Sequence, residues 1–147
     1  SNRLWFDEML GHSFHQQQRF GCILMDLDGF KQINDTLGHD AGDLALQEMA
    51  RILRRVAGPK DTVARYGGDE FAILMHEASE YHLQELVSRI ELEVAMSNQA
   101  SKRGYLLSVS MGYALYDSTH FSDAMTFMAH IDASMYAHKR SKLGNRL

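Results

Sequence analysis

Two pairs of acidic residues each follow an apolar or glycine-containing segment of the chain. Asp26 and Asp28 end the apolar run that begins at Cys22, while Asp69 and Glu70 follow two adjacent glycines. Carboxylates brought together repel each other unless a cation lies between them, and oxygen ligands without a cysteine pattern favour Mg²⁺ or Mn²⁺. A metal held in this way can bind phosphate oxygens and activate a hydroxyl group.

Each pair also has a purely structural interpretation. Asp28 precedes an amphipathic segment and can be its N-cap, which is the interpretation we prefer for this residue. The glycines and acids over 67–70 can be a polar hairpin turn and nothing more. Neither motif alone distinguishes a metal site from the structural interpretation, but their combination in one chain favours a metal site.

The hydrophobic pattern predicts the elements that must position these acids. We expect helices over 4–19, 30–37, 40–56, 83–94 and 121–140, and strands over 22–25, 63–66, 71–75 and 105–116. The residues of the last helix that should face inward are Ala124, Met125, Met128, Ile131 and Met135. This order contains βαββαβ, so we expect an α+β fold of the ferredoxin-like kind, with helices flanking a mostly antiparallel sheet of about five strands. If the first three strands are neighbours, Asp26 and Asp69 face a common point.

The composition restricts the class of protein. The chain has 147 residues, of which 45% are hydrophobic and 23% charged, and its net charge is -4. Such a chain is expected to form one globular domain, and its negative charge argues against nucleic-acid binding. The one cysteine, Cys22, excludes an internal disulfide framework and favours a reducing compartment, so we expect a cytoplasmic domain. No apolar stretch approaches the roughly 18 residues of a membrane span, so no membrane contact is expected of the domain itself.

Four motifs occur in one order along the chain. They are "MDLDGFKQINDTLGHDAGD", "ARYGGDEFAIL", "SVSMGYA" and "DASMYAHK". Together they resemble the GGDEF domain of bacterial diguanylate cyclases, and the resemblance covers nearly the whole chain from near Asn2. It implies the fold of nucleotidyl cyclase catalytic domains, and a reaction in which two GTP molecules form cyclic di-GMP and two pyrophosphates.

The resemblance also implies roles for the acids. Asp26 matches the metal-binding aspartate of the family, and the backbone carbonyl of Leu27 is expected to complete part of the coordination by Mg²⁺ or Mn²⁺. Asp69 matches the second metal ligand, which is also the proposed base for the ribose 3'-hydroxyl. Glu70 matches the neighbouring motif acid, which we place with the catalytic residues.

Further residues match the substrate-binding positions of the family. Gly67 and Gly68 leave room for the nucleotide to approach the backbone, although a turn alone would explain one of them. Lys31 matches a phosphate-contacting lysine, and Asn34 and Asp43 match the residues that read guanine. Without the resemblance, these three would be interpreted as ordinary polar residues on helices.

The C-terminal motif departs from the family pattern. Lys139 matches a triphosphate-binding lysine, but the family continues with glycine and arginine at the third and fourth positions after it. This chain has Lys142 and Leu143 there, and "GNR" follows at 144–146. The resemblance leaves open whether Lys142 or Arg146 replaces the missing arginine.

A second departure concerns regulation. Many family members bind their product at an R-x-x-D motif, and the corresponding stretch here runs from Gly58 to Asp61. The aspartate is retained but the arginine is absent, and glycine cannot replace a guanidinium that binds phosphate. We therefore predict weak or absent product inhibition through this site.

The resemblance favours a Mg²⁺-dependent diguanylate cyclase domain spanning residues 1–147. The product has two-fold symmetry, so two GTP-loaded subunits are expected to meet in a homodimer. The alternative is a catalytically silent module that binds GTP or mediates dimerisation. The family usually has a further segment before Asn2, so we expect an excised domain whose parent has an N-terminal sensory region, with membrane attachment of that parent left open.

Overall fold

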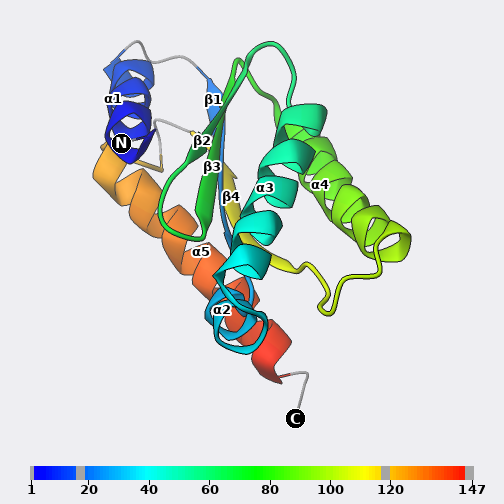
Figure 1. Ribbon diagram of the computed structural model, residues 1–147. Helices are drawn as coiled ribbons and strands as arrows, with labels where there is room; N and C mark the ends of the chain where they lie inside the picture. Colours follow the sequence, from blue (N-terminus) through cyan, green and yellow to red (C-terminus); the bar gives the residue numbers. More distant parts are fainter. Residues whose placement is uncertain (1, 16–18, 117–119, 145–147) are drawn as a thin grey trace.

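The computed structural model describes residues 2–15, 19–116 and 120–144 (Figure 1). Its elements are α1 (Asn2–His15), β1 (Phe20–Leu27), α2 (Phe30–Leu37), α3 (His39–Val56), β2 (Asp61–Arg65), β3 (Glu70–His76), α4 (Glu80–Ala100), β4 (Val109–Leu115) and α5 (Ala124–Gly144). The strands form one antiparallel sheet in the order β2-β3-β1-β4. The α+β architecture predicted from the sequence is confirmed.

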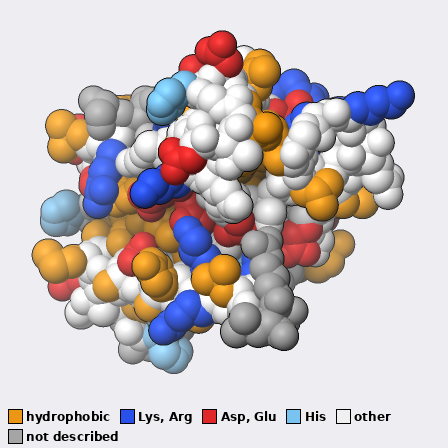
Figure 2. Space-filling model, turned by 60° about the horizontal axis from the view of Figure 1, so that its bottom comes forward, with side chains coloured by type: hydrophobic (Ala, Val, Ile, Leu, Met, Phe, Trp, Pro, Cys, Tyr) orange, Lys and Arg blue, Asp and Glu red, His pale blue; other side chains and the backbone are white. Residues whose placement is uncertain are grey.

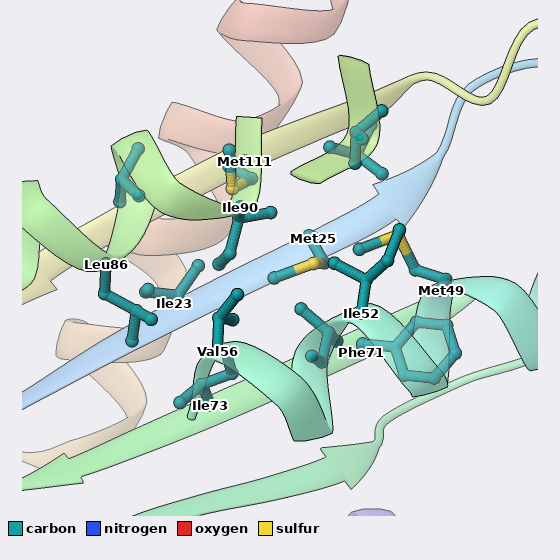
Figure 3. Packing of buried hydrophobic residues seen from close by; sticks show 14 of the residues in the cluster. Ile23, Met25, Met49, Ile52, Val56, Phe71, Ile73, Leu86, Ile90 and Met111 are labelled. Atoms are coloured by element: carbon teal, nitrogen blue, oxygen red, sulfur yellow. The ribbon is translucent and has the colours of Figure 1, made fainter. Parts of the chain in front are cut away.

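The sheet lies between two layers of helices. In Figure 1, α1 and α5 lie on one side of the sheet, and α3 and α4 lie on the other. Every residue of β1 is buried, because this central strand is covered on both faces. Ile23 and Met25 pack with α3 and α4, as Figure 3 shows, whereas Cys22 and Leu24 pack with α1 and α5. The period of two along β1 therefore directs Asp26 towards α5.

The sheet has four strands in the described residues, not the five or so that the sequence predicts. The last predicted strand begins at Val109 and not at Tyr105. The side chain of Asn98 accepts a hydrogen bond from the Leu107 N–H and donates one to the Leu107 carbonyl, both at 2.8 Å. The backbone groups of Leu107 are thus satisfied by a side chain from α4, which removes the need for strand pairing.

The inward face of α5 differs in part from the prediction. Ile131 and Met135 are buried, but Met125 is 81% exposed and Phe127 is fully buried in its place. Phe127, Ile131 and Met135 are spaced four residues apart, so they form one stripe along the helix.

Helix α5 lies very close to β4. A β-carbon at Gly112 would be 2.1 Å from the carbonyl oxygen of Ile131 and 2.5 Å from the backbone nitrogen of Met135. Only glycine allows this approach. The Met111 N–H of the same edge strand donates to His138 Nδ1 at 3.0 Å, so a side chain of α5 satisfies an edge donor of the sheet. None of the helices within the described ranges is long and apolar enough to cross a membrane.

Candidate active site

The end of β1 and the turn between β2 and β3 meet at one edge of the sheet. Asp26 pairs with Glu70 in the β1–β3 register, and the Leu27 N–H donates to the Asp69 carbonyl at 3.0 Å. The structure therefore places Asp26 and Leu27 next to Asp69 and Glu70 at this edge of the sheet. Burial raises the pKa of Glu70, and the negative charges of Asp69 and Asp26 raise it further.

Asp26 is a buried carboxylate whose two oxygens differ. Lys139 Nζ donates to Oδ2 at 3.0 Å, while Oδ1 is buried and has no hydrogen-bond partner in the described part of the chain. Burial raises the pKa of Asp26 more than Lys139 lowers it. A buried carboxylate oxygen without a partner is costly unless a ligand satisfies it.

The donor set is compatible with a hard divalent cation. No group of three or more His, Cys, Asp or Glu side chains within the described residues could hold a metal. The predicted site needs only Asp26, Asp69 and the backbone carbonyl of Leu27, with water and phosphate oxygens in the remaining positions, as Mg²⁺ prefers. Oδ1 of Asp26 is the atom that such an ion would satisfy.

Asp28 is not the N-cap of α2, so that interpretation is wrong. The N-cap is Gly29, with φ 67°, and it makes no side-chain capping bond. Asp28 accepts hydrogen bonds instead from Ser110 at 2.6 Å, Ser108 at 2.7 Å and Lys142 at 2.8 Å. Burial favours a higher pKa for Asp28, but the hydrogen bonds from Lys142, Ser110 and Ser108 outweigh it, so the pKa is lowered.

Lys139 and Lys142 of α5 thus contact Asp26 in β1 and Asp28 just after it. Besides Asp28, Lys142 contacts the Val109 carbonyl and, at 3.5 Å, the Ser108 hydroxyl. Leu143 is 56% exposed, and Arg146 lies outside the described residues. Figure 2 shows acidic and basic side chains side by side on the face near α2 and the end of α5.

The predicted guanine-reading residues lie close together at the start of α3. Asn34 Oδ1 lies over Gly42, where a β-carbon would be only 1.8 Å away, and Asp43 is the next residue. Asp43 also lines a hollow of about 530 Å³ between α3, β2 and β3, together with Leu46, Gln47, Arg65 and Phe71. Lys31 is exposed in the first turn of α2.

The glycine turn has neighbours that restrict it. A β-carbon at Gly67 would lie 2.5 Å from Glu70 Oε1, whereas Gly68 has open space around it. Arg65 braces the turn, because its guanidinium donates to the Gly68 carbonyl at 2.6 Å and the Gly67 carbonyl at 3.3 Å. The sequence analysis missed this role of Arg65, which has no signal beyond a basic residue near a turn.

Helix α1 contacts the residue that precedes the glycines. Tyr66 donates a hydrogen bond to Asp7 at 2.9 Å, its ring packs edge-on against Phe6, and the Arg3 guanidinium lies 4.6 Å from the ring centre. Burial, with the hydrogen bond to Asp7, raises the pKa of Tyr66 to about 12. These contacts join elements far apart in sequence, and the sequence analysis missed them.

The stretch that corresponds to the R-x-x-D motif forms a closed turn. Asp61 Oδ2 accepts from the Gly58 N–H at 2.7 Å, and the Asp61 N–H donates to the Gly58 carbonyl at 3.0 Å. The turn lines a hollow of about 400 Å³ that also includes Lys60, His82 and Arg89.

A family model described as the diguanylate cyclase GGDEF domain matches residues 1–145. The chain belongs to the GGDEF domain family. The GGDEF domain is 36% identical over 142 residues to the bifunctional diguanylate cyclase/cyclic di-GMP phosphodiesterase MucR of Pseudomonas aeruginosa, covering 92% of this chain and 20% of MucR. It is 30% identical to the cyclic di-GMP phosphodiesterase PdeR of Escherichia coli, covering 97% of this chain and 22% of PdeR.

Solved structures agree with this assignment. The crystal structure of the GGDEF domain of DgcB from Caulobacter crescentus, in complex with c-di-GMP, superposes with a TM-score of 0.84 at 30% identity, covering 96% of this chain and 86% of that one. The GGDEF domain therefore shares its fold as well as its motifs with the family. It spans about a fifth of the length of the two curated relatives.

Proposed function

We propose that this GGDEF domain is the catalytic domain of a diguanylate cyclase, which condenses two GTP molecules into cyclic di-GMP and releases two pyrophosphates. One observation carries the proposal: a buried oxygen of Asp26 has no hydrogen-bond partner among the described residues, near Asp69 and at the edge where Lys139 also lies. Family membership supports the same activity.

The chemistry is the attack of a ribose 3'-hydroxyl on an α-phosphate. Each of the two steps forms one P–O bond, breaks the bond to the pyrophosphate and releases one proton. Asp69 takes that proton, while Asn34 and Asp43 orient guanine through its hydrogen-bonding edge. Lys31 and Lys139 bind the triphosphate. Mg²⁺ or Mn²⁺ held by Asp26, Asp69 and the Leu27 carbonyl would neutralise charge on the phosphates.

Two domains must meet for this reaction, because each presents one GTP to the other. A two-fold axis between identical half-sites gives both attacks the same geometry. The test is to incubate a concentrated preparation with GTP and Mg²⁺ and to identify the products by chromatography and mass spectrometry. Cyclic di-GMP is the expected product; a preparation that is dimeric by light scattering and forms none would refute the proposal.

A second candidate is a GGDEF module that binds GTP without cyclising it, or serves in dimerisation. This candidate is supported by the end of α5, where the sequence departs from the family pattern and Lys142 contacts Asp28. Another point in its favour is that PdeR is named only as a phosphodiesterase. Equilibrium binding of GTP without turnover would favour this candidate over the cyclase.

Gly42→Ala is expected to raise the KM for GTP about tenfold, with a smaller change in kcat, because the new methyl group must displace the Asn34 amide. Steady-state kinetics with varied GTP give both constants. Gly11→Ala is the matched helix substitution, since a β-carbon there meets no atom of the described residues within 4 Å, and it should leave the KM unchanged. An unchanged KM for Gly42→Ala would exclude Asn34 from guanine binding.

Cyclic di-GMP is expected to bind weakly or not at all to the hollow near Gly58, because no arginine stands at that position. Calorimetric titration of the nucleotide-free domain measures the affinity. Gly58→Arg should strengthen binding, since a β-carbon at 58 meets only Asp61 Oδ2 at 3.4 Å. Tight binding by the wild-type domain that is lost in Asp61→Ala would show the prediction to be wrong.

A further inference from the structure

Two lysines of α5 contact two aspartates at the end of β1 in matching order. Asp26 belongs to β1 and Asp28 to the turn that follows it. Both carboxylates contact α5, where Lys139 and Lys142 are about one turn apart. The Lys139–Asp26 distance is 3.0 Å and the Lys142–Asp28 distance is 2.8 Å. The two pairs look alike, but their surroundings differ.

Lys142 and Asp28 form a closed network. Both oxygens of Asp28 have hydrogen-bond donors, one from Ser110 and the other from Ser108 and Lys142, and Lys142 also contacts the Val109 carbonyl. A part-buried network in which every member is satisfied resists rearrangement. It joins the end of α5 to the ends of β1 and β4.

Lys139 and Asp26 form an open pair. Lys139 is the one partner of Asp26 among the hydrogen bonds of the described residues, and Oδ1 of the same carboxylate has none. The Lys139 side chain is 34% exposed, so solvent and ligands can reach it. Lys139 Nζ lies 3.0 Å from Oδ2 of Asp26, so the two side chains form an ion pair.

We propose that Lys139 is the built-in counterion of Asp26 in the nucleotide-free domain, where it opposes metal binding until a triphosphate draws its ammonium group away. The metal and GTP then bind cooperatively, so the metal binds more weakly when GTP is absent. This inference rests on the proposed metal site and GTP substrate.

The charges make the exchange favourable only when both ligands are present. A divalent cation approaching Asp26 is repelled by an ammonium group that already contacts the same carboxylate. Moving Lys139 away without a new anion would leave an unpaired cation and a buried carboxylate, and removing one partner of such a pair is costly. The triphosphate supplies the new anion, and its own charge attracts the metal.

The test is Mn²⁺ binding to the nucleotide-free domain, measured by electron paramagnetic resonance of the free ion. Lys139→Met should bind Mn²⁺ about tenfold more tightly than the wild type, although it removes a residue that GTP needs. Lys139→Arg retains the cation and should resemble the wild type. Arg140→Met removes the same charge from the next position of α5 and should change the affinity little. Thermal unfolding of each variant checks that it is folded.

Each outcome bears on one proposal. If folded Lys139→Met binds Mn²⁺ no more tightly than the wild type, Lys139 is not a counterion that opposes the metal, even where cyclic di-GMP is formed. If Lys139→Met alone gains affinity and the dimeric wild type forms no cyclic di-GMP, the inference stands and the proposed enzymatic function fails. An equal gain in Mn²⁺ affinity in Arg140→Met would show that loss of any positive charge from this part of α5 has the same effect. That result would overturn the inference.

Discussion

Asp69→Asn is expected to reduce the rate of cyclic di-GMP formation by about 10³-fold or more. Asparagine keeps the shape of the side chain but removes the negative charge that holds a metal and the basic oxygen that accepts the 3'-hydroxyl proton. Loss of a general base costs about 10²–10⁴-fold, and weaker metal binding adds to this. Chromatographic measurement of product from GTP and Mg²⁺ gives the rate. The side chain is only partly buried, so the unfolding temperature should change little.

Glu77→Gln is the matched control for this variant. Asp69 precedes β3 and Glu77 follows it, so the two acids stand at opposite ends of one strand. Glu77 forms an exposed ion pair with Lys60 at 2.8 Å, and such pairs contribute little to stability. Glu77→Gln should keep full activity. An Asp69→Asn variant with wild-type activity would refute the assignment of the metal site and the base.

Gly112→Ala is expected to lower the free energy of unfolding by about 3 kcal/mol or more. The methyl group would overlap the Ile131 carbonyl oxygen at 2.1 Å and the Met135 nitrogen at 2.5 Å. Both atoms belong to the backbone of α5, so the whole helix must move away from β4. Forced overpacking typically costs 1–3 kcal/mol, and displacement of a helix costs more. Urea unfolding followed by circular dichroism measures the change.

Gly21→Ala separates this overlap from the general effect of changing a strand glycine. A β-carbon at Gly21 would meet three side-chain atoms, each at 3.4 Å or more, which is an ordinary contact distance. Its stability should therefore stay within about 1 kcal/mol of the wild type. Equal stability of the two variants would mean that α5 does not pack on β4 as closely as the structure shows. Folded Gly112→Ala should also lose activity, because α5 carries Lys139.

The fold was predictable because its signals are local. The apolar run Cys22–Met25 marks a strand covered on both faces, and the glycines before Asp69 mark the hairpin. Apolar residues follow a 3.6-residue period over 40–56 and 83–94, which predicts α3 and α4, and residues of that period such as Met49 and Ile90 are fully buried. The buried face of α5 was harder to predict because its exposed side also carries large apolar residues, Met125 and Tyr136, so Met125 was wrongly placed inside.

The contacts of Asp28 were not predictable, because its partners are far away in sequence. An aspartate before a helix is usually an N-cap, and nothing nearby shows that two serines and a lysine lie 80 or more residues later. The polar residues of β4 were a weak signal, since Ser110 is fully buried in a strand and must find a partner. That partner is Asp28, which lies near Ser110 because β1 pairs with β4.

The proposed roles of the individual site residues also rest on the family resemblance and not on geometry alone. Asn34 and Asp43 would be ordinary helical polar residues without the family resemblance, and the structure adds that Asn34 lies over Gly42. The contact of α1 with Tyr66 had no sequence signal, because it depends on how the first helix packs against the hairpin.

The central claim is that two copies of this domain convert two GTP into one cyclic di-GMP. The most direct test fuses the domain to a dimeric coiled coil and measures cyclic di-GMP and pyrophosphate together, with Asp69→Asn in the same fusion as the control. We predict two pyrophosphates for each cyclic di-GMP, and at least about 10³-fold less of both from the control. A fused dimer that binds GTP and releases neither product would contradict the account and favour a silent GGDEF module.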